Sequence, residues 1–294
     1  AGGTARNHTL TDSSRGVTKG LFSSLNDAEA TNAQGLTSFN SDGFSVGTYN
    51  NFNESSGTYV AWQWIANGGT TANNTSGDIG TSVVQANTTA GISIVLYTGN
   101  NTGGSTVGHG LGGVPEWIIA KSRAANKPWV VYHVSLGNTK SIKLNATDAA
   151  ATDSSSWTNT TPSSTTFSLG NGDSNHTGTM VAYCFRSIQG YSKFGSYTGN
   201  GNDDGPFVYT GFKPAWVMYK RSNDAGNWRI LDNKRNTFNV IDNEIYADLS
   251  NAEAEDNQMD FLSNGFKLRN GSSVGQNGDG STYIYMAFAE HPFV

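Results

Sequence analysis

The stretch YTGN at residues 97–100, followed by VPEWIIAKSR at residues 114–123, decides how this sequence is interpreted, because both parts occur twice. The second copy reads YTGN at residues 197–200 and KPAWVMYKR at residues 213–221. Self-similarity at a long, fixed interval indicates a chain that is built from repeated structural units. The sequence therefore predicts at least two copies of one unit in the C-terminal two thirds of the chain.

Both copies end on an apolar segment, which reads MVAYCF at residues 180–185 and YIYMAF at residues 283–288. Between the two motifs, short runs of β-branched and aromatic residues are bracketed by Gly, Asn, Asp or Pro, which is the pattern of short strands joined by turns. The closing segments are apolar at every position, as expected of a central strand that is covered on both faces.

A third copy begins at the N-terminus, and it is incomplete. DSSRGVTK at residues 12–19 aligns without a gap with HVSLGNTK at residues 133–140, and YVAWQW at residues 59–64 is its predicted closing strand. The alignment leaves this copy without the equivalent of residues 97–121, which contain two predicted strands. Because a sandwich without two strands exposes unpaired edges, we expect that a longer chain preceded Ala1 or that a neighbouring chain supplies these strands.

These patterns predict an all-β protein of tandem antiparallel β-sandwich repeats, with a jelly-roll or concanavalin A-like topology. The tryptophans of the predicted strands are expected to build the cores. The predicted domains are residues 1–66 (the N-terminally incomplete repeat 1), 67–92 (a connector with a possible strand in 79–85), 93–188 (repeat 2) and 189–294 (repeat 3).

The composition narrows the function classes. Only 14% of the 294 residues are charged and 36 are glycine, while aromatic residues reach 11%, so the chain is neither an average charged domain nor a disordered tract. The net charge of −5 provides no basic footprint for nucleic acid. No apolar run approaches the roughly 18 residues of a membrane helix, and we expect no membrane insertion. A single cysteine, Cys184, excludes a disulfide framework within one chain.

The motifs resemble a repeat domain of uncharacterised virion and tail-fibre proteins of tailed bacteriophages, often marine ones. The resemblance is carried by YTGN, GHGLG at residues 108–112, PEWIIAKSR, LTSFNSDGF at residues 36–44 and the ending YIYMAFAEHPF at residues 283–293. It implies a structural or adhesive protein of the virion surface, in a tail or surface fibre that attaches to the host. The implied partners are other virion proteins, a host surface glycan or receptor, and further copies in a homo-oligomer.

Two alternatives remain open at this stage: a capsid or tail decoration protein, and a polysaccharide depolymerase. A glycosidase needs two neighbouring carboxylates, and Glu29 and Glu253 occupy matching positions. Ala150 replaces them in the second copy, which favours a scaffold role. We therefore predict no catalytic residues, no enzymatic activity and no cofactor.

Asp12 and Arg15 have the same spacing as Asp232 and Arg235. A polar ligand site would fit this pair, but a local ion pair or turn-stabilising hydrogen bonds are favoured. His133 stands where the other copies have aspartate, and a position whose residue type changes between copies indicates a hydrogen-bonding role in the scaffold.

Trp157 lies in a Ser/Thr-rich segment, and we predict that it is an exposed residue that could stack on a sugar. The Asn/Asp/Gly turns contain Asp203, Asp204 and Asp279, whose carboxylates are candidates for calcium ligands. The same residue types are ordinary in hairpin turns, so no metal site is assigned.

Overall fold

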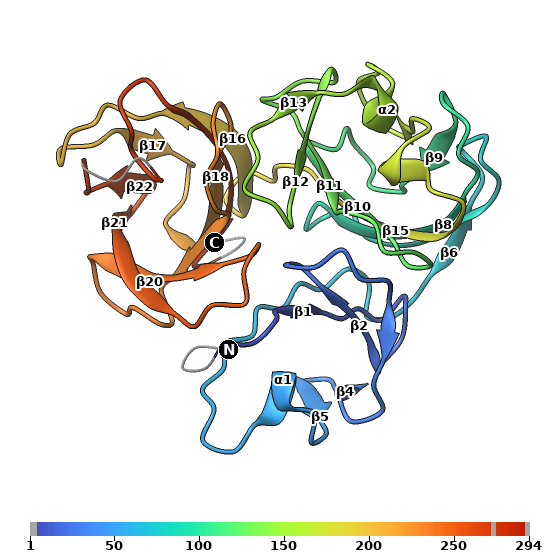
Figure 1. Cartoon of the computed structure of the whole chain (residues 1–294), viewed down its shortest axis with the longest axis horizontal. Helices are drawn as coiled ribbons and strands as arrows, with labels where there is room; N and C mark the ends of the chain where they lie inside the picture. The colour runs from blue at the N-terminus through green and yellow to red at the C-terminus, as the bar shows by residue number, and fades with distance from the viewer. Residues whose placement is uncertain (1–4, 272–274, 292–294) are drawn as a thin grey trace.

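The computed structural model describes residues 5–271 and 275–291. Figure 1 shows three lobes arranged around a common centre. We call them lobe 1 (residues 5–66), lobe 2 (residues 67–188) and lobe 3 (residues 189–291). The regular structure of all three is β, apart from two four-residue helices and one 3-10 turn, which confirms the predicted all-β class.

Lobe 2 contains one large antiparallel sheet in the order β13-β12-β11-β10-β15-β8-β7-β6 and a two-stranded sheet of β9 and β14. β7 shows that the predicted extra strand of the connector exists, and it extends the sheet beside β8. The elements of lobe 2 are β6 (Ala72–Asn74), β7 (Ser82–Asn87), β8 (Ile92–Gly99), β9 (Thr106–Gly108), β10 (Trp117–Ser122), β11 (Val130–His133), β12 (Lys140–Lys143), β13 (Ala151–Thr152), α2 (Ser154–Trp157), β14 (Thr166–Ser168), η1 (Asp173–Asn175) and β15 (Gly178–Phe185).

Lobe 3 forms one antiparallel sheet in the order β16-β23-β18-β19-β20-β21-β22-β17, which curls into a nearly closed barrel. Its strands are β16 (Ser192–Thr198), β17 (Phe207–Tyr209), β18 (Pro214–Arg221), β19 (Arg229–Asp232), β20 (Ile241–Tyr246), β21 (Ala254–Leu262), β22 (Gly265–Leu268) and β23 (Thr282–Ala289).

Lobes 2 and 3 share a run of five strands in the same order, because β12-β11-β10-β15-β8 corresponds to β20-β19-β18-β23-β16. The registers agree as well. Trp117 lies opposite His133 on one side and Phe185 on the other, and Trp216 lies opposite Asp232 and Phe288. These are the pairs that the sequence alignment places at matching positions.

Lobe 1 is smaller. Its three-stranded sheet β1-β2-β3 matches part of the larger sheets, since Thr9 pairs with Phe22 as Val130 pairs with Lys143. A separate hairpin joins β4 to β5. The elements are β1 (Thr9–Leu10), β2 (Lys19–Phe22), β3 (Ala30–Thr31), β4 (Leu36–Phe39), β5 (Phe44–Val46) and α1 (Asn50–Asn53).

The prediction of a closing strand at residues 59–64 is wrong, because this segment has no regular secondary structure. The physical reason is the lack of strands to pair with. β15 is held between β10 and β8, and β23 between β18 and β16. In the described part of lobe 1 no strand flanks residues 59–64.

The three lobes share one apolar core, in which most of the tryptophans lie. Trp117, Trp129 and Trp228 are fully buried there, and the rings of Trp117 and Trp228 are 5.7 Å apart. Trp62 and Trp64 of lobe 1 pack edge-on against Trp216 of lobe 3. The expectation that these tryptophans build a core is confirmed, although the core lies between the lobes. Lobes 2 and 3 each have a second apolar core of their own on the opposite face of the sheet.

The YTGN motifs are explained by two buried asparagines that bind them. The Asn175 amide donates to Asn100 Oδ1 and Thr102 O, both at 2.9 Å, and its Oδ1 accepts the Asn100 N–H. Asn277 binds Asn200 in the same way. The tyrosine hydroxyl of each motif donates to the chain one residue before the asparagine, at Ser174 O and Gln276 O. The glycine leaves room for that same strand of chain, since a Cβ on Gly99 would lie 2.2 Å from His176 O.

We predict that Asn175→Ala lowers the free energy of unfolding by about 2–3 kcal/mol, because it leaves buried backbone and side-chain groups without partners. Asn138→Ala is the matched control, since Asn138 is only half-buried and its hydrogen bond to Thr161 Oγ1 is exposed to solvent; a change within about 0.5 kcal/mol is expected there. Urea unfolding followed by tryptophan fluorescence measures both. Equal losses in the two variants would contradict the assigned role of Asn175.

Candidate functional site

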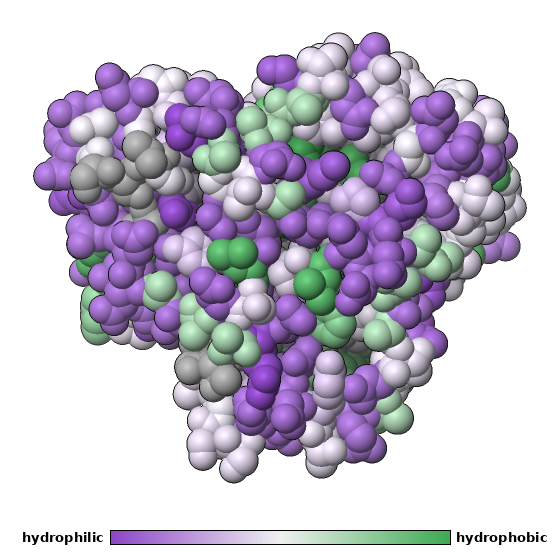
Figure 2. All heavy atoms as spheres, viewed as in Figure 1, coloured by the Kyte–Doolittle hydropathy of each residue, from purple (hydrophilic) through white to green (hydrophobic). Residues whose placement is uncertain are grey.

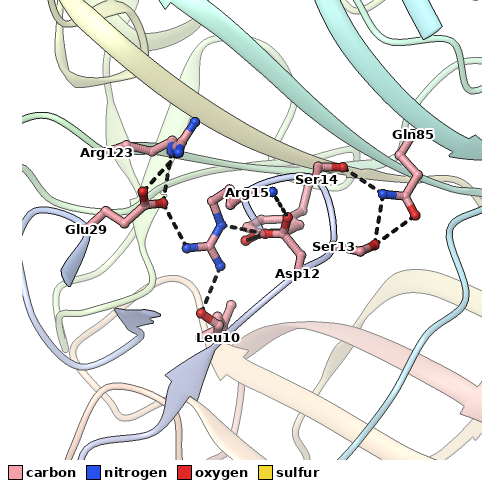
Figure 3. Close-up of polar contacts among 9 residues, drawn as sticks. Leu10, Asp12, Ser13, Ser14, Arg15, Glu29, Gln85 and Arg123 are labelled. Atoms are coloured by element: carbon pink, nitrogen blue, oxygen red, sulfur yellow. Dashed lines mark hydrogen bonds and ion pairs between the residues drawn. The ribbon is translucent and has the colours of Figure 1, made fainter. Parts of the chain in front are cut away.

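A buried ion-pair network stands where lobe 1 meets lobe 2 (Figure 3). Arg15 Nε lies 2.5 Å from Asp12 Oδ2, and both residues are 6% exposed. The remaining guanidinium nitrogens bind Leu10 O at 2.8 Å and Glu29 Oε2 at 3.1 Å. All the charged groups of this cluster are therefore paired within the protein.

Lobe 3 repeats the arrangement. Arg235 Nε lies 2.6 Å from Asp232 Oδ2, and the other nitrogens bind Ile230 O at 3.0 Å and Glu253 Oε2 at 2.9 Å. The predicted local ion pair is confirmed in both copies. The third member of each set, Glu29 or Glu253, was weighed from the sequence only as a possible catalytic carboxylate, and the structure shows that its partner is the arginine.

The lobe 1 network extends into lobe 2 through Arg123 and Tyr183. Arg123 binds both carboxylate oxygens of Glu29 at 2.9 Å, and the Tyr183 hydroxyl donates to Asp12 Oδ2 at 2.7 Å. Burial raises the Glu29 pKa, but the hydrogen bonds and charges of Arg123 and Arg15 outweigh it and hold this pKa below its ordinary value. Glu29 is thus a carboxylate that bridges two lobes, and its geometry is unsuited to proton transfer.

In lobe 2 a neutral histidine occupies the position that Asp12 and Asp232 hold in lobes 1 and 3. His133 is fully buried; its Nδ1 accepts the Ser135 N–H at 3.0 Å, and its Nε2 is 3.4 Å from Tyr285 O of lobe 3, to which it donates. Burial lowers the His133 pKa to about 4, against a smaller opposing effect of the Tyr285 hydrogen bond. The predicted scaffold role of His133 is confirmed.

Further contacts between lobes recur at matching positions. Trp129 Nε1 donates to Phe22 O at 2.9 Å, and Trp228 Nε1 donates to Lys143 O at 2.8 Å. In lobe 1 the matching residue is His8, which hydrogen-bonds to the backbone of Tyr246. Lobe 2 therefore contacts lobe 1, lobe 3 contacts lobe 2, and lobe 1 contacts lobe 3, in a ring of three similar junctions.

Two buried lysines reinforce these junctions. Lys121 Nζ donates to Asn26 O at 3.0 Å, and Lys220 Nζ donates to Thr147 O at 2.9 Å. Burial lowers the pKa of each lysine to about 8, partly offset by nearby aspartates. Sequence reasoning did not assign these lysines a role, although their shared position four residues after Trp117 and Trp216 was a usable signal.

Trp157 is not exposed, so that prediction was wrong. It is 1% exposed, and its ring packs 6.0 Å from Tyr132 and 6.5 Å from Phe167 in the inner core of lobe 2. Asp153 caps the N-terminus of α2 by accepting the Ser155 N–H, and this short helix turns the indole inward. Ser154, Ser155 and Asn159 therefore face solvent, whereas Ser156 and the indole are buried.

The three aspartates considered as calcium ligands each lie against other groups of the protein. Asp203 Oδ1 accepts the Gly271 N–H at 2.9 Å, Asp204 pairs with Lys267 at 2.8 Å, and Asp279 lies against Gly201. Within residues 5–271 and 275–291, no group of three or more His, Cys, Asp or Glu side chains could hold a metal ion. In the same residues no helix is long and apolar enough to cross a membrane.

Lobe 1 has a cleft where lobe 2 has a packed inner core. This cleft has a volume of about 110 Å³ and is lined by Thr9, Gly20, Leu36, Tyr49 and Phe52, among others. In lobe 2 the corresponding space is filled by Trp157, Phe167 and the inner face of the sheet. The cleft is the open inner face of lobe 1.

The fold and these junctions define a class: an all-β protein whose three lobes are locked together by buried polar contacts around a common core. Residues 2–292 match the model of one family, the domain of unknown function DUF7483, and the chain belongs to this family. No curated protein and no solved structure matches the chain.

We predict that Arg15→Ala destabilises the protein by about 3–5 kcal/mol, because Asp12 would remain buried without its cation. The matched control is Arg6→Ala, which removes the partly exposed ion pair with Glu54 and should cost less than about 1 kcal/mol. Chemical unfolding at pH 7.5 measures both variants. A small effect of Arg15→Ala would show that the junction between lobes 1 and 2 does not depend on this pair.

The His133 imidazole predicts a loss of stability in acid. Its pKa is about 4 in the folded protein and 6.5 in an ordinary environment, so between these values the unfolded chain binds the proton and the folded chain does not. This contribution is fully present above pH 6.5 and is lost as the pH falls towards 4, up to about 3 kcal/mol. Asp248 has a raised pKa of about 6 and acts in the opposite direction, so a variant comparison is needed.

The comparison uses His133→Asn, which keeps an acceptor for the Ser135 N–H but does not titrate. The melting temperatures of wild type and variant are measured from pH 7.5 to 4.5. We expect wild type to be the more stable at pH 7.5 and the difference to narrow as the pH falls. Parallel curves would contradict a buried neutral His133.

Proposed function

We propose that this protein is a structural and adhesive component of a tailed-bacteriophage virion, located on the virion surface in a tail or surface fibre that attaches to the host. We also propose that the three lobes are diverged copies of one antiparallel β-sandwich unit of the jelly-roll or concanavalin A-like kind. The single observation that carries the proposal is that the charged residues repeated between copies lie at the junctions between lobes.

The repeated charged residues favour a scaffold over an active site. Glu29 and Glu253, the carboxylates that a depolymerase would have used, each bind the arginine of their own junction. A general acid or base has to exchange a proton with the substrate. These carboxylates are instead held in ion pairs at lobe boundaries. The position of Asp232 in lobe 3 is occupied by His133 in lobe 2. This change alters the polar contacts of the junction, while the strand register is kept.

The surface supports an extracellular particle component. The face drawn in Figure 2 is largely hydrophilic, and its apolar atoms form small separate patches. Since charged residues are only 14% of the chain, much of this polarity comes from Asn, Thr, Ser and Gly. Neutral amides and hydroxyls present hydrogen-bond donors and acceptors to a glycan without a strong field, which suits attachment to host polysaccharide.

The architecture of lobe 2 supports the sandwich proposal. Its large sheet is covered on the inner face by the β9–β14 pair, and Val107 and Phe167 of this pair share an apolar cluster with Val95 and Ile118 of the sheet. Two layers that enclose one core are the defining feature of a sandwich. Lobe 3 reaches a similar enclosure by curling its sheet.

The test is a competition experiment with the phage that encodes the chain and its host. Purified protein labelled with a fluorophore should bind host cells and reduce phage adsorption at least about tenfold at saturation, since one receptor serves both. Binding to purified capsids or tails without binding to cells would assign it a decorating role instead. Release of reducing sugar from host polysaccharide would overturn the non-enzymatic proposal.

A further inference from the structure

Lobe 1 lacks the strand that lies at the centre of the sheet in the other lobes. β10 lies between β11 and β15, and β18 lies between β19 and β23. In lobe 1, β1 corresponds to β11, and the segment 59–64 corresponds to β15. In the described residues β1 pairs with β2 alone, so its other edge is unpaired. We call the space between β1 and residues 59–64 the vacant strand position.

The backbone of β1 is oriented to bind a strand there. His8 O accepts the Ser23 N–H at 3.1 Å, so His8 directs its backbone groups towards β2. Because alternate residues of an antiparallel strand direct these groups to opposite sides, the N–H and C=O of Thr9 face the vacant strand position. Lobe 2 shows the completed arrangement, with Trp129 O bound by Leu144 N–H and Val130 paired with Ala120 of β10.

A buried polar atom without a partner lies at the same edge. Thr9 Oγ1 is buried and has no hydrogen-bond partner. A buried polar atom of this kind costs about 1–3 kcal/mol, and such atoms are uncommon in native proteins. Its place on an unpaired strand points to an occupant that supplies a hydrogen bond.

The exposure of residues 59–64 points to the same vacancy. Tyr59 is 37% exposed, whereas Met180, at the matching position of lobe 2, is fully buried. Ala61 and Gln63 are exposed, whereas Ala182 and Cys184, at the matching positions of lobe 2, are fully buried. This segment therefore has the exposure of a central strand whose neighbours are missing, and an occupant would cover it.

We propose that lobe 1 accepts one extended strand from a partner polypeptide, inserted antiparallel between β1 and residues 59–64. The inference stands on these edges and does not rest on the proposed virion function. Main-chain hydrogen bonds to an unpaired edge are a general way for a protein to bind an extended peptide. Here the strand would have two edges to pair with instead of one.

The other lobes define the chemistry of the occupant. Strands β10 and β18 each carry a tryptophan followed four residues later by a lysine. These pairs are Trp117 with Lys121 and Trp216 with Lys220. The tryptophans enter the shared core, and the lysines bind backbone carbonyls of the next lobe. These carbonyls, Asn26 and Thr147, precede Glu29 and Ala150 by three residues. The matching residue in lobe 3 is Ser250, three before Glu253, whose carbonyl would receive the lysine of the inserted strand.

A second copy of this chain is a poor source for the strand. β10 and β18 are almost completely buried at the centres of their own sheets, and their removal would dismantle lobe 2 or lobe 3. The occupant is therefore a segment of a different polypeptide with the pattern Trp, apolar, apolar, any residue, Lys.

The test uses a synthetic peptide, PEWIIAKSR, which reproduces residues 115–123, and the whole chain. Titration calorimetry measures binding, and hydrogen exchange locates it. We expect saturable one-to-one binding, a higher melting temperature, and amide exchange slowed at least about tenfold in fragments that cover residues 8–11 and 58–65. No binding, or protection confined to another edge such as β6, would overturn the proposal.

Two control peptides separate strand insertion from apolar adsorption. A peptide with N-methyl groups on alternate backbone amides keeps every side chain but cannot pair on one edge, and it should bind at least about tenfold more weakly. A peptide with alanine in place of the tryptophan should also lose affinity, because it leaves the core position empty. Equal binding by the N-methylated peptide would overturn the inserted strand. Dimers of the free protein that the peptide dissociates would assign the position to a second copy and overturn the partner assignment.

Discussion

Strands β15 of lobe 2 and β23 of lobe 3 bury both of their faces, and the architecture of the molecule depends on this constraint. Every residue from Met180 to Phe185 is buried, and so is every residue from Tyr283 to Phe288. One face of each sheet covers the inner core of its own lobe, and the other face contributes to the core that all three lobes share. A single lobe would expose this second face to water, at a cost of about 25 cal/mol for each Å² of apolar surface. The lobes are therefore stable together and not as separate sandwiches.

An apolar core by itself does not fix how three similar lobes are arranged, because apolar contacts are not directional. The polar contacts at the lobe boundaries supply the direction. Each indole or lysine donor meets a backbone carbonyl at one matching position of the neighbouring lobe, as Trp129 meets Phe22 and Trp228 meets Lys143. A shift of one residue would leave these buried donors without partners. Hydrogen bonds of modest net strength thus determine the relative placement of lobes that the hydrophobic effect holds together.

Much of the sheet could be predicted from the repeat, because matching motifs imply matching strands and registers. The register of Trp117 opposite Phe185 is an example. The errors have physical causes. Residues 59–64 have a strand sequence, yet a strand needs neighbours, and their absence from lobe 1 leaves the segment irregular. Trp157 has polar neighbours, but the Asp153 cap turns its indole inward. Contacts such as Lys121 with Asn26 join residues far apart in the chain, and no local pattern encodes them.

The three junctions also show how a buried ion pair can be lost. Lobes 1 and 3 have aspartate, arginine and glutamate at three matching positions, while lobe 2 has His133, Leu136 and Ala150. Leu136 and Ala150 pack against the shared core. Loss of the arginine alone would have stranded two carboxylates in a buried site, whereas replacement of the whole set by neutral or apolar residues removes the cost of burying charge. All three members therefore differ together in lobe 2. The substitution pattern within this one chain is what a buried network requires, and it is not the pattern of a ligand site in which each residue contacts the ligand independently.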